Sequence, residues 1–419
     1  MSKVIEMYRL AKERYAQIGV DTDRAIAILK QIPLSIHCWQ GDDGKGFEQK
    51  ETDVNTGIMA TGNYLGRARN AEELRSDLSV ALDLIPGRKK LNLHSIYAET
   101  NGKKVERNEL EYCYFENWVA FAKEKKIGMD FNPTIYNHVN MKDGYSLSSP
   151  DKSIRAFWIE HVKRCRAIAD QIGRQLESPC VNNIWISDGS KDNCLNKGQL
   201  RENLMNSLDE IFQISYDKAY LLDALEPKLF GIGTESFVVG SLEFYLGYAI
   251  KNQKLLCLDT GHFHPTELVS EKISSLLAYC DRLLLHLSRG VRWDSDHVTA
   301  LDAELMNIFT EIQALNAFDR VHCALDYFDA SINRISAWVI GARNVQKAIL
   351  KSLLDPIESI RKAEQEGDLG TRLALMEESK TLPFGAVYDY VCESCGIPVG
   401  ENWLKIVKDY EKKVLVNRI

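Results

Sequence analysis

The sequence lacks the features of a membrane protein, a nucleic-acid-binding protein or a dinucleotide-binding fold. No apolar run approaches the roughly 20 residues that cross a bilayer. No long run of lysine or arginine occurs, and the net charge of −7 argues against a nucleic-acid partner. No Gly-x-Gly-x-x-Gly motif follows an early apolar run, which weighs against nicotinamide or flavin dinucleotides. We therefore expect neither a membrane nor a nucleic-acid role.

The ten cysteines do not form a disulfide framework in a chain of 419 residues. Several lie inside apolar runs, which is typical of buried thiols. Cys392 and Cys395 match C-x-x-C, but no second pair completes a zinc ribbon, so we interpret this pair as structural. The cytoplasm, where thiols stay reduced, is the simplest location for such a chain.

Short apolar runs alternate with helical patterns along most of the chain. An apolar fraction of 45% and a charged fraction of 26% are those of a globular protein with a large core. The strand-like runs are 33–38, 90–94, 128–131, 183–186, 219–225, 254–258, 282–287 and 320–325. The helical patterns between them are 71–82, 107–124, 153–172, 197–212, 241–251, 272–278 and 300–313. This α/β alternation predicts a parallel sheet, and about eight repeats favour a closed (β/α)8 TIM barrel.

Three segments fall outside this alternation. Residues 1–30 form an amphipathic helical lead-in, which is not a signal peptide, and residues 332–419 form a mostly helical extension. We therefore divide the chain into a barrel with its N-terminal helix, 1–331, and an extension, 332–419, that is expected to make oligomer contacts. Residues 41–66 follow the first strand as a long loop rich in Gly, Asp, Asn and Thr. Such a loop is either a mobile cover over the barrel mouth or an ordinary surface loop.

Acids and histidines stand at or just after the ends of the later strand-like runs. Since strand ends of a (β/α)8 barrel meet at one face, these side chains should converge there. Carboxylates and imidazoles brought together would repel one another or lose solvation, and a cation resolves both problems. The oxygen and nitrogen donors favour manganese, magnesium or cobalt over structural zinc, and their number implies two ions. The candidates are Glu226, Asp259, His262, His286, Asp294, Asp296 and Asp326.

Other residues at the strand ends are candidates for binding a sugar. Trp39, His94 and Trp185 combine apolar faces with polar groups, as a sugar requires. Lys228 follows Glu226 by two positions and either pairs with it or polarises a substrate oxygen. Asp326 is the candidate helper of proton movement through a bound water. Ile58, Met59, Tyr64 and Leu65 in the first loop are candidate apolar walls.

At these residues the chain resembles the L-rhamnose isomerase family, over essentially its whole length. The sequences Gly-His-Phe-His-Pro-Thr-Glu at 261–267 and Arg-Trp-Asp-Ser-Asp-His at 292–297 together are specific for that family. The resemblance implies a homotetramer and Mn²⁺-dependent interconversion of L-rhamnose and L-rhamnulose, with Co²⁺, Zn²⁺ or Mg²⁺ able to substitute. It assigns a catalytic ion to His262, Asp294 and Asp296. It assigns a second, structural ion to Glu226, Asp259, His286 and Asp326.

Hydrogen would move between C1 and C2 of the open sugar, either as a metal-assisted hydride shift or through an enediol formed by a carboxylate base. Three rivals to this function remain. Another metal-dependent sugar isomerase or epimerase would use the same type of barrel. A metal-dependent barrel nuclease would need a basic phosphate track, which the net charge of −7 disfavours. A non-catalytic sugar-binding or scaffold protein would have no use for seven ligands.

Overall fold

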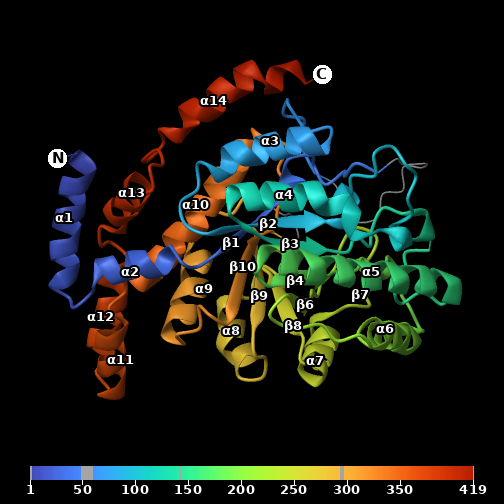
Figure 1. Ribbon diagram of the computed structural model, residues 1–419. Helices are drawn as coiled ribbons and strands as arrows, with labels where there is room; N and C mark the ends of the chain where they lie inside the picture. The colour runs from blue at the N-terminus through green and yellow to red at the C-terminus, as the bar shows by residue number, and fades with distance from the viewer. Residues whose placement is uncertain (1, 49–59, 142, 293–296, 419) are drawn as a thin grey trace.

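Eight parallel strands close into a barrel surrounded by helices, and this confirms the predicted (β/α)8 fold (Figure 1). The computed structural model describes residues 2–48, 60–141, 143–292 and 297–418. Around the barrel the strands follow the order β1-β10-β9-β8-β6-β4-β3-β2. They are β1 (Leu34–His37), β2 (Lys89–His94), β3 (Gly128–Asn132), β4 (Cys180–Ile184), β6 (Leu221–Leu225), β8 (Leu255–Asp259), β9 (Leu283–Leu287) and β10 (Val321–Leu325).

All eight predicted runs are barrel strands, but β4 lies three residues earlier than expected. It was predicted at 183–186 and is found at Cys180–Ile184, paired with β6 from Cys180 opposite Leu221 to Ile184 opposite Leu225. The polar pair Asn182 and Asn183 hides the strand, because buried strands of a parallel sheet are usually apolar throughout. The apolar residues that follow belong to the loop at the barrel mouth.

Seven of the eight outer helices correspond to the predicted ones, with one difference, and the eighth, α10 (Arg334–Leu353), belongs to the segment predicted as the helical extension. They are α3 (Ala71–Leu82), α4 (Glu116–Lys125), α5 (Lys152–Leu176), α6 (Lys197–Ile211), α7 (Leu242–Asn252), α8 (Ser270–Leu277), α9 (Ala303–Ala314) and α10 (Arg334–Leu353). The pattern at 107–124 is not one helix, because Leu110 is extended (φ −62°, ψ 142°) and separates a 3₁₀ turn at Arg107–Glu109 from a second one, Tyr112–Phe115, that leads directly into α4. A short antiparallel pair, β5 (Gly189–Ser190) and β7 (Phe237–Val238), lies outside the barrel.

Helix α10 completes the outer ring, since it packs on α9, α3 and β1. The remaining helices are α1 (Lys3–Ala16), α2 (Thr22–Leu29), α11 (Ile357–Gln365), α12 (Leu369–Ser379), α13 (Phe384–Ser394) and α14 (Trp403–Lys413). In Figure 1, α1, α2 and α11 to α13 lie to the left of the barrel, and α14 passes above α3. The lead-in is therefore two helices rather than one. The division at residue 331 stays a prediction, and within 332–419 the helices outside the ring are α11 to α14. No helix of the described ranges is long and apolar enough to span a bilayer.

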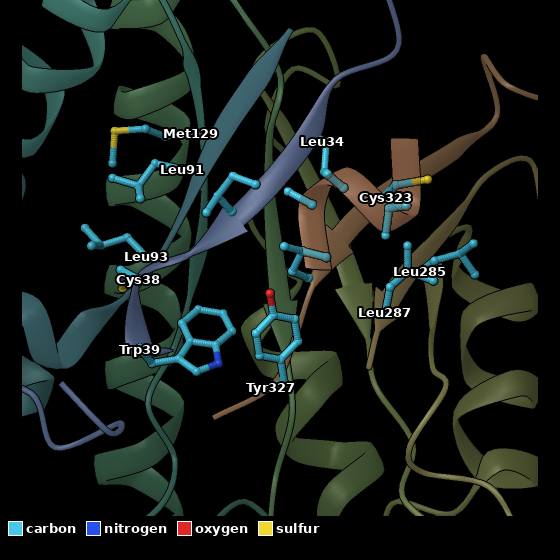
Figure 2. Packing of buried hydrophobic residues seen from close by; sticks show 14 of the residues in the cluster. Leu34, Cys38, Trp39, Leu91, Leu93, Met129, Leu285, Leu287, Cys323 and Tyr327 are labelled. Carbon is cyan, nitrogen blue, oxygen red and sulfur yellow. The ribbon is translucent and has the colours of Figure 1, made fainter. Parts of the chain in front are cut away.

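The core has two parts, and the inner one positions the site. An apolar layer fills the space between strands and helices, and Figure 2 shows part of it, including Leu91, Met129 and Leu285. A smaller cluster fills the inside of the barrel: Val181, Leu222, Ala224, Leu255, Cys257, Leu284 and Ala324. Side chains alternate along a strand, so the residue two positions after an inner residue also points inward. By this rule Ala224, Cys257, Leu284 and Ala324 are followed at the mouth by Glu226, Asp259, His286 and Asp326.

Candidate active site

Four side chains that can bind a metal lie together above the apolar inner cluster. Atoms of Glu226, Asp259, His286 and Asp326 all lie within 4.8 Å of one another. The first three residues are buried and Asp326 is half-buried. Cys257 lies beside Glu226 and His286, but burial raises the pKa of its thiol, so it remains protonated. The compact set of ligand atoms is therefore three carboxylates and one imidazole.

His286 lies between two carboxylates without forming an aligned hydrogen bond to either. Its Nδ1 is 2.8 Å from Asp326 Oδ2 and 3.2 Å from Glu226 Oε2. Among the described residues, neither ring nitrogen has a hydrogen-bond partner, and Oδ2 of Asp259 also has none. Buried polar atoms without partners destabilise a fold by about 1–3 kcal/mol each unless a ligand compensates. A bound cation would satisfy these atoms.

The pKa values show that the buried carboxylates of this cluster repel one another and favour nearby positive charge. Burial, with repulsion from Asp326 and Glu226, raises the pKa of Asp259 to about 7. Burial acts on Glu226 in the same direction, but His286 and His262 outweigh it and hold the pKa of Glu226 well below its ordinary value. For His286 burial lowers the pKa, yet the negative groups around it raise the pKa well above 6.5. The pocket thus favours positive charge, and a divalent ion would supply it in place of protons.

His262 extends this cluster from the loop after β8. Its Nδ1 lies 3.2 Å from Glu226 Oε1, and its Nε2 lies 3.9 Å from Asp259 Oδ2. The other two members of the predicted catalytic-ion set, Asp294 and Asp296, lie outside the described residues. The structure therefore places His262 next to the four clustered ligands and leaves the second ligand set as a prediction.

Hydrogen-bond donors from other parts of the chain orient the clustered carboxylates. Asn183 Nδ2 donates to Glu226 Oε2 at 2.5 Å, and Trp39 Nε1 donates to Asp326 Oδ1 at 2.9 Å. The backbone N–H of Gly261 donates to Asp259 Oδ1 at 2.7 Å. Sequence reasoning missed Asn183, although its inward position is two residues after Val181 of the inner cluster. Hydrogen bonds of this type fix the direction in which a ligand oxygen points.

The clustered side chains form one wall of a cavity with about 510 Å³ of empty volume. The four predicted substrate-binding residues, Trp39, His94, Trp185 and Lys228, all line it. Its lining also includes Asn132, Tyr136, Asn183 and Phe328. Tyr136 had not been predicted, because it lies in a loop four residues beyond the end of β3. A cavity that combines aromatic walls with many polar and charged side chains suits a small polar molecule with apolar faces.

Aromatic rings arrange the polar groups of the cavity. The rings of Trp39 and His94 meet edge to face with centroids 4.7 Å apart, and Tyr136 lies 6.0 Å from Trp185. Lys228 Nζ lies 5.0 Å from the centre of the Trp185 ring. Burial lowers the pKa of His94 to about 3, so its imidazole is neutral near pH 7. The cavity thus offers the ammonium of Lys228 and the neutral imidazole of His94 in addition to the carboxylates.

One residue of the motif at 261–267 and two of the first loop lie away from the cavity. His264 is exposed and hydrogen-bonds Thr266 Oγ1 at 2.7 Å. Tyr64 and Leu65 do not line the cavity; the Tyr64 hydroxyl donates to Glu411 at 2.9 Å, and the Leu65 side chain is 44% exposed. The proposed apolar wall is therefore wrong for these two residues. Ile58 and Met59 lie outside the described residues.

A closed barrel with a buried cluster of metal ligands beside an aromatic cavity is the architecture of a metal-dependent barrel enzyme that acts on small molecules. The family model described as L-rhamnose isomerase (RhaA) matches residues 2–418. The chain belongs to the L-rhamnose isomerase family.

Curated relatives agree with this assignment over their full length. An L-rhamnose isomerase of Mannheimia succiniciproducens is 53% identical over 100% of both chains. One from Salmonella gallinarum is 52% identical over 99% of this chain and 98% of its own, and one from Rhodopirellula baltica is 51% identical over 98% and 96%. The matched region includes both the barrel and the helical extension.

Proposed function

We propose that the protein is an aldose–ketose isomerase that interconverts L-rhamnose and L-rhamnulose. The observation that supports this most is the cluster of Glu226, Asp259, His286 and Asp326 beside an aromatic cavity, in a chain whose relatives carry that activity in their names. In the forward direction the hydrogen on C2 moves to C1 while a proton moves from O2 to O1. The reaction needs no external oxidant or reductant, since C2 is oxidised as C1 is reduced.

The donor set fits divalent ions, with Mn²⁺ as the expected metal. Glu226, Asp259, His286 and Asp326 would hold the structural ion, and His262 with Asp294 and Asp296 would hold the catalytic one. When bound, such ions supply Lewis acidity toward the carbonyl and hydroxyl oxygens of the open sugar. The support is the chemistry of the donors, all oxygen or imidazole nitrogen, together with the buried atoms that have no partner.

The protein's own groups would bind and orient the sugar. Lys228, held over the face of Trp185, can donate to O1 or O2 and stabilise negative charge there. His94 stays neutral and can therefore exchange hydrogen bonds with hydroxyls without adding charge. Asp326 is oriented by Trp39 and would assist proton movement between O2 and O1 through water. The rings of Trp39, Tyr136, Trp185 and Phe328 would pack on apolar faces of the sugar and exclude bulk water.

Isomerisation in D₂O distinguishes the two chemical routes. An enediol formed by a carboxylate base exchanges the C2 hydrogen with solvent, so the ketose would carry deuterium at C1. A hydride shift transfers that hydrogen directly and leaves C1 without deuterium. NMR of the product at low conversion measures the ratio.

A panel of deoxy-aldoses tests the proposed activity itself. The Mn²⁺-loaded protein should convert L-rhamnose to L-rhamnulose faster than the other members of the panel. The protein treated with a chelator should not. Conversion by the metal-free protein, or turnover of a different sugar with L-rhamnose untouched, would contradict the proposal.

The helical extension supports a proposal of self-association into a homotetramer. Leu369, Leu373 and Met376 follow helical spacing on α12 and are 55%, 54% and 40% exposed. A row of this kind on a projecting pair of helices is the type of surface that a second copy would cover (Figure 1). Light scattering should give four times the mass of the 47.6 kDa chain. Leu373→Glu should lower that mass, while an exposed change on the same helix, Glu377→Gln, should not.

The cysteines support a location in the cytoplasm. All ten are free thiols, and Cys38, Cys165, Cys180 and Cys257 are among the buried ones. A chain that folds without disulfides suits a reducing compartment. Fractionation of cells into cytoplasmic and exported protein would test this location.

A further inference from the structure

Two loops at the barrel mouth are bonded to each other, and residues from the C-terminus hold them. We call residues 61–66, after β1, and residues 329–334, after β10, the loop junction. Within it the backbone N–H of Tyr64 donates to Ala330 O at 2.7 Å, and the N–H of Ala330 donates to Thr61 O at 3.1 Å. The second loop directly follows Asp326 and Phe328, both of which line the cavity.

Glu411 of α14 joins the two loops with one oxygen. Its Oε2 accepts from the Tyr64 hydroxyl at 2.9 Å and from Asn333 Nδ2 at 2.6 Å. Asn333 is buried, and its Oδ1 caps α10 by accepting from the N–H groups of Ile335 and Ser336 at 3.0 and 3.1 Å. A half-buried carboxylate that accepts two hydrogen bonds is a strong, directional restraint.

Further contacts fix the same loop from the same side. The guanidinium of Arg334 binds both oxygens of Asp43 at 2.8 and 2.9 Å and donates to Tyr64 O at 2.8 Å. Arg418 donates to Gly66 O at 3.0 Å. At Gly66, where φ is +80°, an added Cβ would lie 2.4 Å from the Cβ of Leu415, so the C-terminal segment allows no side chain there.

We infer that Glu411 is a positioning residue for the sugar cavity, although it lies outside it. Its bonds to Tyr64 and Asn333 hold the loop junction, and the junction in turn holds the segment that carries Asp326 and Phe328. The C-terminal helix thereby sets the shape of one cavity wall. This inference rests on the proposed function only for its effect on the sugar; the effect on the loops is independent of it.

The test compares Glu411→Ala with Glu411→Gln. Gln can still place one oxygen between Tyr64 and Asn333, whereas Ala cannot. Glu411→Ala should raise the KM for L-rhamnose about tenfold, because a displaced wall weakens sugar binding, and should change kcat less than the KM. Glu411→Gln should stay close to wild type. Asp409→Ala removes an exposed acid from the same helix and serves as the matched control.

Hydrogen exchange gives a readout that needs no activity. The amides of Tyr64 and Ala330, which bond the two loops, should exchange faster in Glu411→Ala than in Asp409→Ala, while those of the barrel strands should not change. Tyr64→Phe, which removes one of the two bonds to Glu411, should give the same pattern more weakly. A lower melting temperature with unchanged KM and unchanged exchange at these amides would overturn the inference. If the wild type converts no deoxy-aldose, the proposed function fails and the exchange measurement alone decides the role of Glu411.

Discussion

Charged groups lie inside the barrel at both of its ends, and they differ in whether the chain supplies their partners. Toward the amino ends of the strands, Lys90 and Asp130 form an ion pair. Asp130 also accepts from Ser35 Oγ at 2.7 Å and from the N–H of Val181 at 2.9 Å, and Lys90 donates to Pro179 O at 2.8 Å. Each charge there has an opposite charge and additional hydrogen bonds. At the carboxyl ends, three carboxylates crowd one imidazole, and several buried atoms find no partner in the part of the chain that the structure describes.

This difference separates a structural charge from a functional one. A buried ion pair whose partners are complete needs nothing more from solution. A buried cluster that is incomplete within the chain destabilises the fold until a ligand completes it, which is the usual state of a binding site. Asp130 lies in a strand that runs to the mouth, but its partners place it in the complete set at the other end.

Removing one carboxylate at the mouth should have the largest effect. Glu226→Gln keeps the shape and loses the charge, so activity should fall on the order of a thousandfold while the fold remains. Steady-state kinetics with Mn²⁺ and circular dichroism measure the two effects. Glu271→Gln, an exposed change on α8, is the control. An active Glu226→Gln protein would show that turnover does not depend on an ion held by this cluster.

Breaking the pair at the other end should change stability instead of activity. Asp130→Asn leaves Lys90 buried without its counter-charge, which should lower the free energy of unfolding by about 3–5 kcal/mol. The KM for the sugar should stay near that of the wild type. The double change Lys90→Met with Asp130→Leu should recover most of the lost stability in urea unfolding at fixed protein concentration. If Asp130→Asn instead changed the KM strongly and left the free energy of unfolding normal, the charges at the amino ends would be the functional ones.

Most strands and most ligands at the mouth could be predicted from the sequence, for physical reasons. The strands were found because each is a short apolar run, and the ligands at the mouth because acids and histidines follow those runs. Asn183 and Tyr136 were missed, since a polar residue inside a buried strand and an aromatic residue in a loop leave no pattern. Tyr64 and Leu65 were misplaced because the position of their loop depends on contacts with Glu411 and Arg418, more than 300 residues away in sequence.

The amino end should also contribute a pH dependence of stability through His322. Burial, with the nearby charge of Lys90, lowers the pKa of His322 from 6.5 to about 4, and Asp130 and Arg282 are the other charged groups that act on it. The unfolded chain therefore takes up this proton at a higher pH than the folded one, and falling pH favours unfolding between 6.5 and about 4. His322→Gln should flatten the pH dependence of the unfolding free energy in that window. An unchanged slope would mean that His322 titrates normally.

The smallest effect concerns the choice of sugar. L-Mannose differs from L-rhamnose only at C6, where a hydroxymethyl replaces the methyl. Burying one methyl against an apolar wall contributes about 1 kcal/mol, so the preference for L-rhamnose should be within roughly tenfold. Phe328→Ala should narrow that preference and leave Mn²⁺ binding intact. Faster turnover of L-mannose by the wild type would exclude an apolar wall at C6.

The most direct test of the account is to locate the metal. Crystals grown with Mn²⁺, measured at the manganese absorption edge, should show an anomalous peak among Glu226, Asp259, His286 and Asp326 and none beside Lys90 and Asp130. The peak should disappear in Glu226→Gln. A well-ordered barrel with Mn²⁺ present and no peak at the mouth would contradict the claim that a cation completes this cluster.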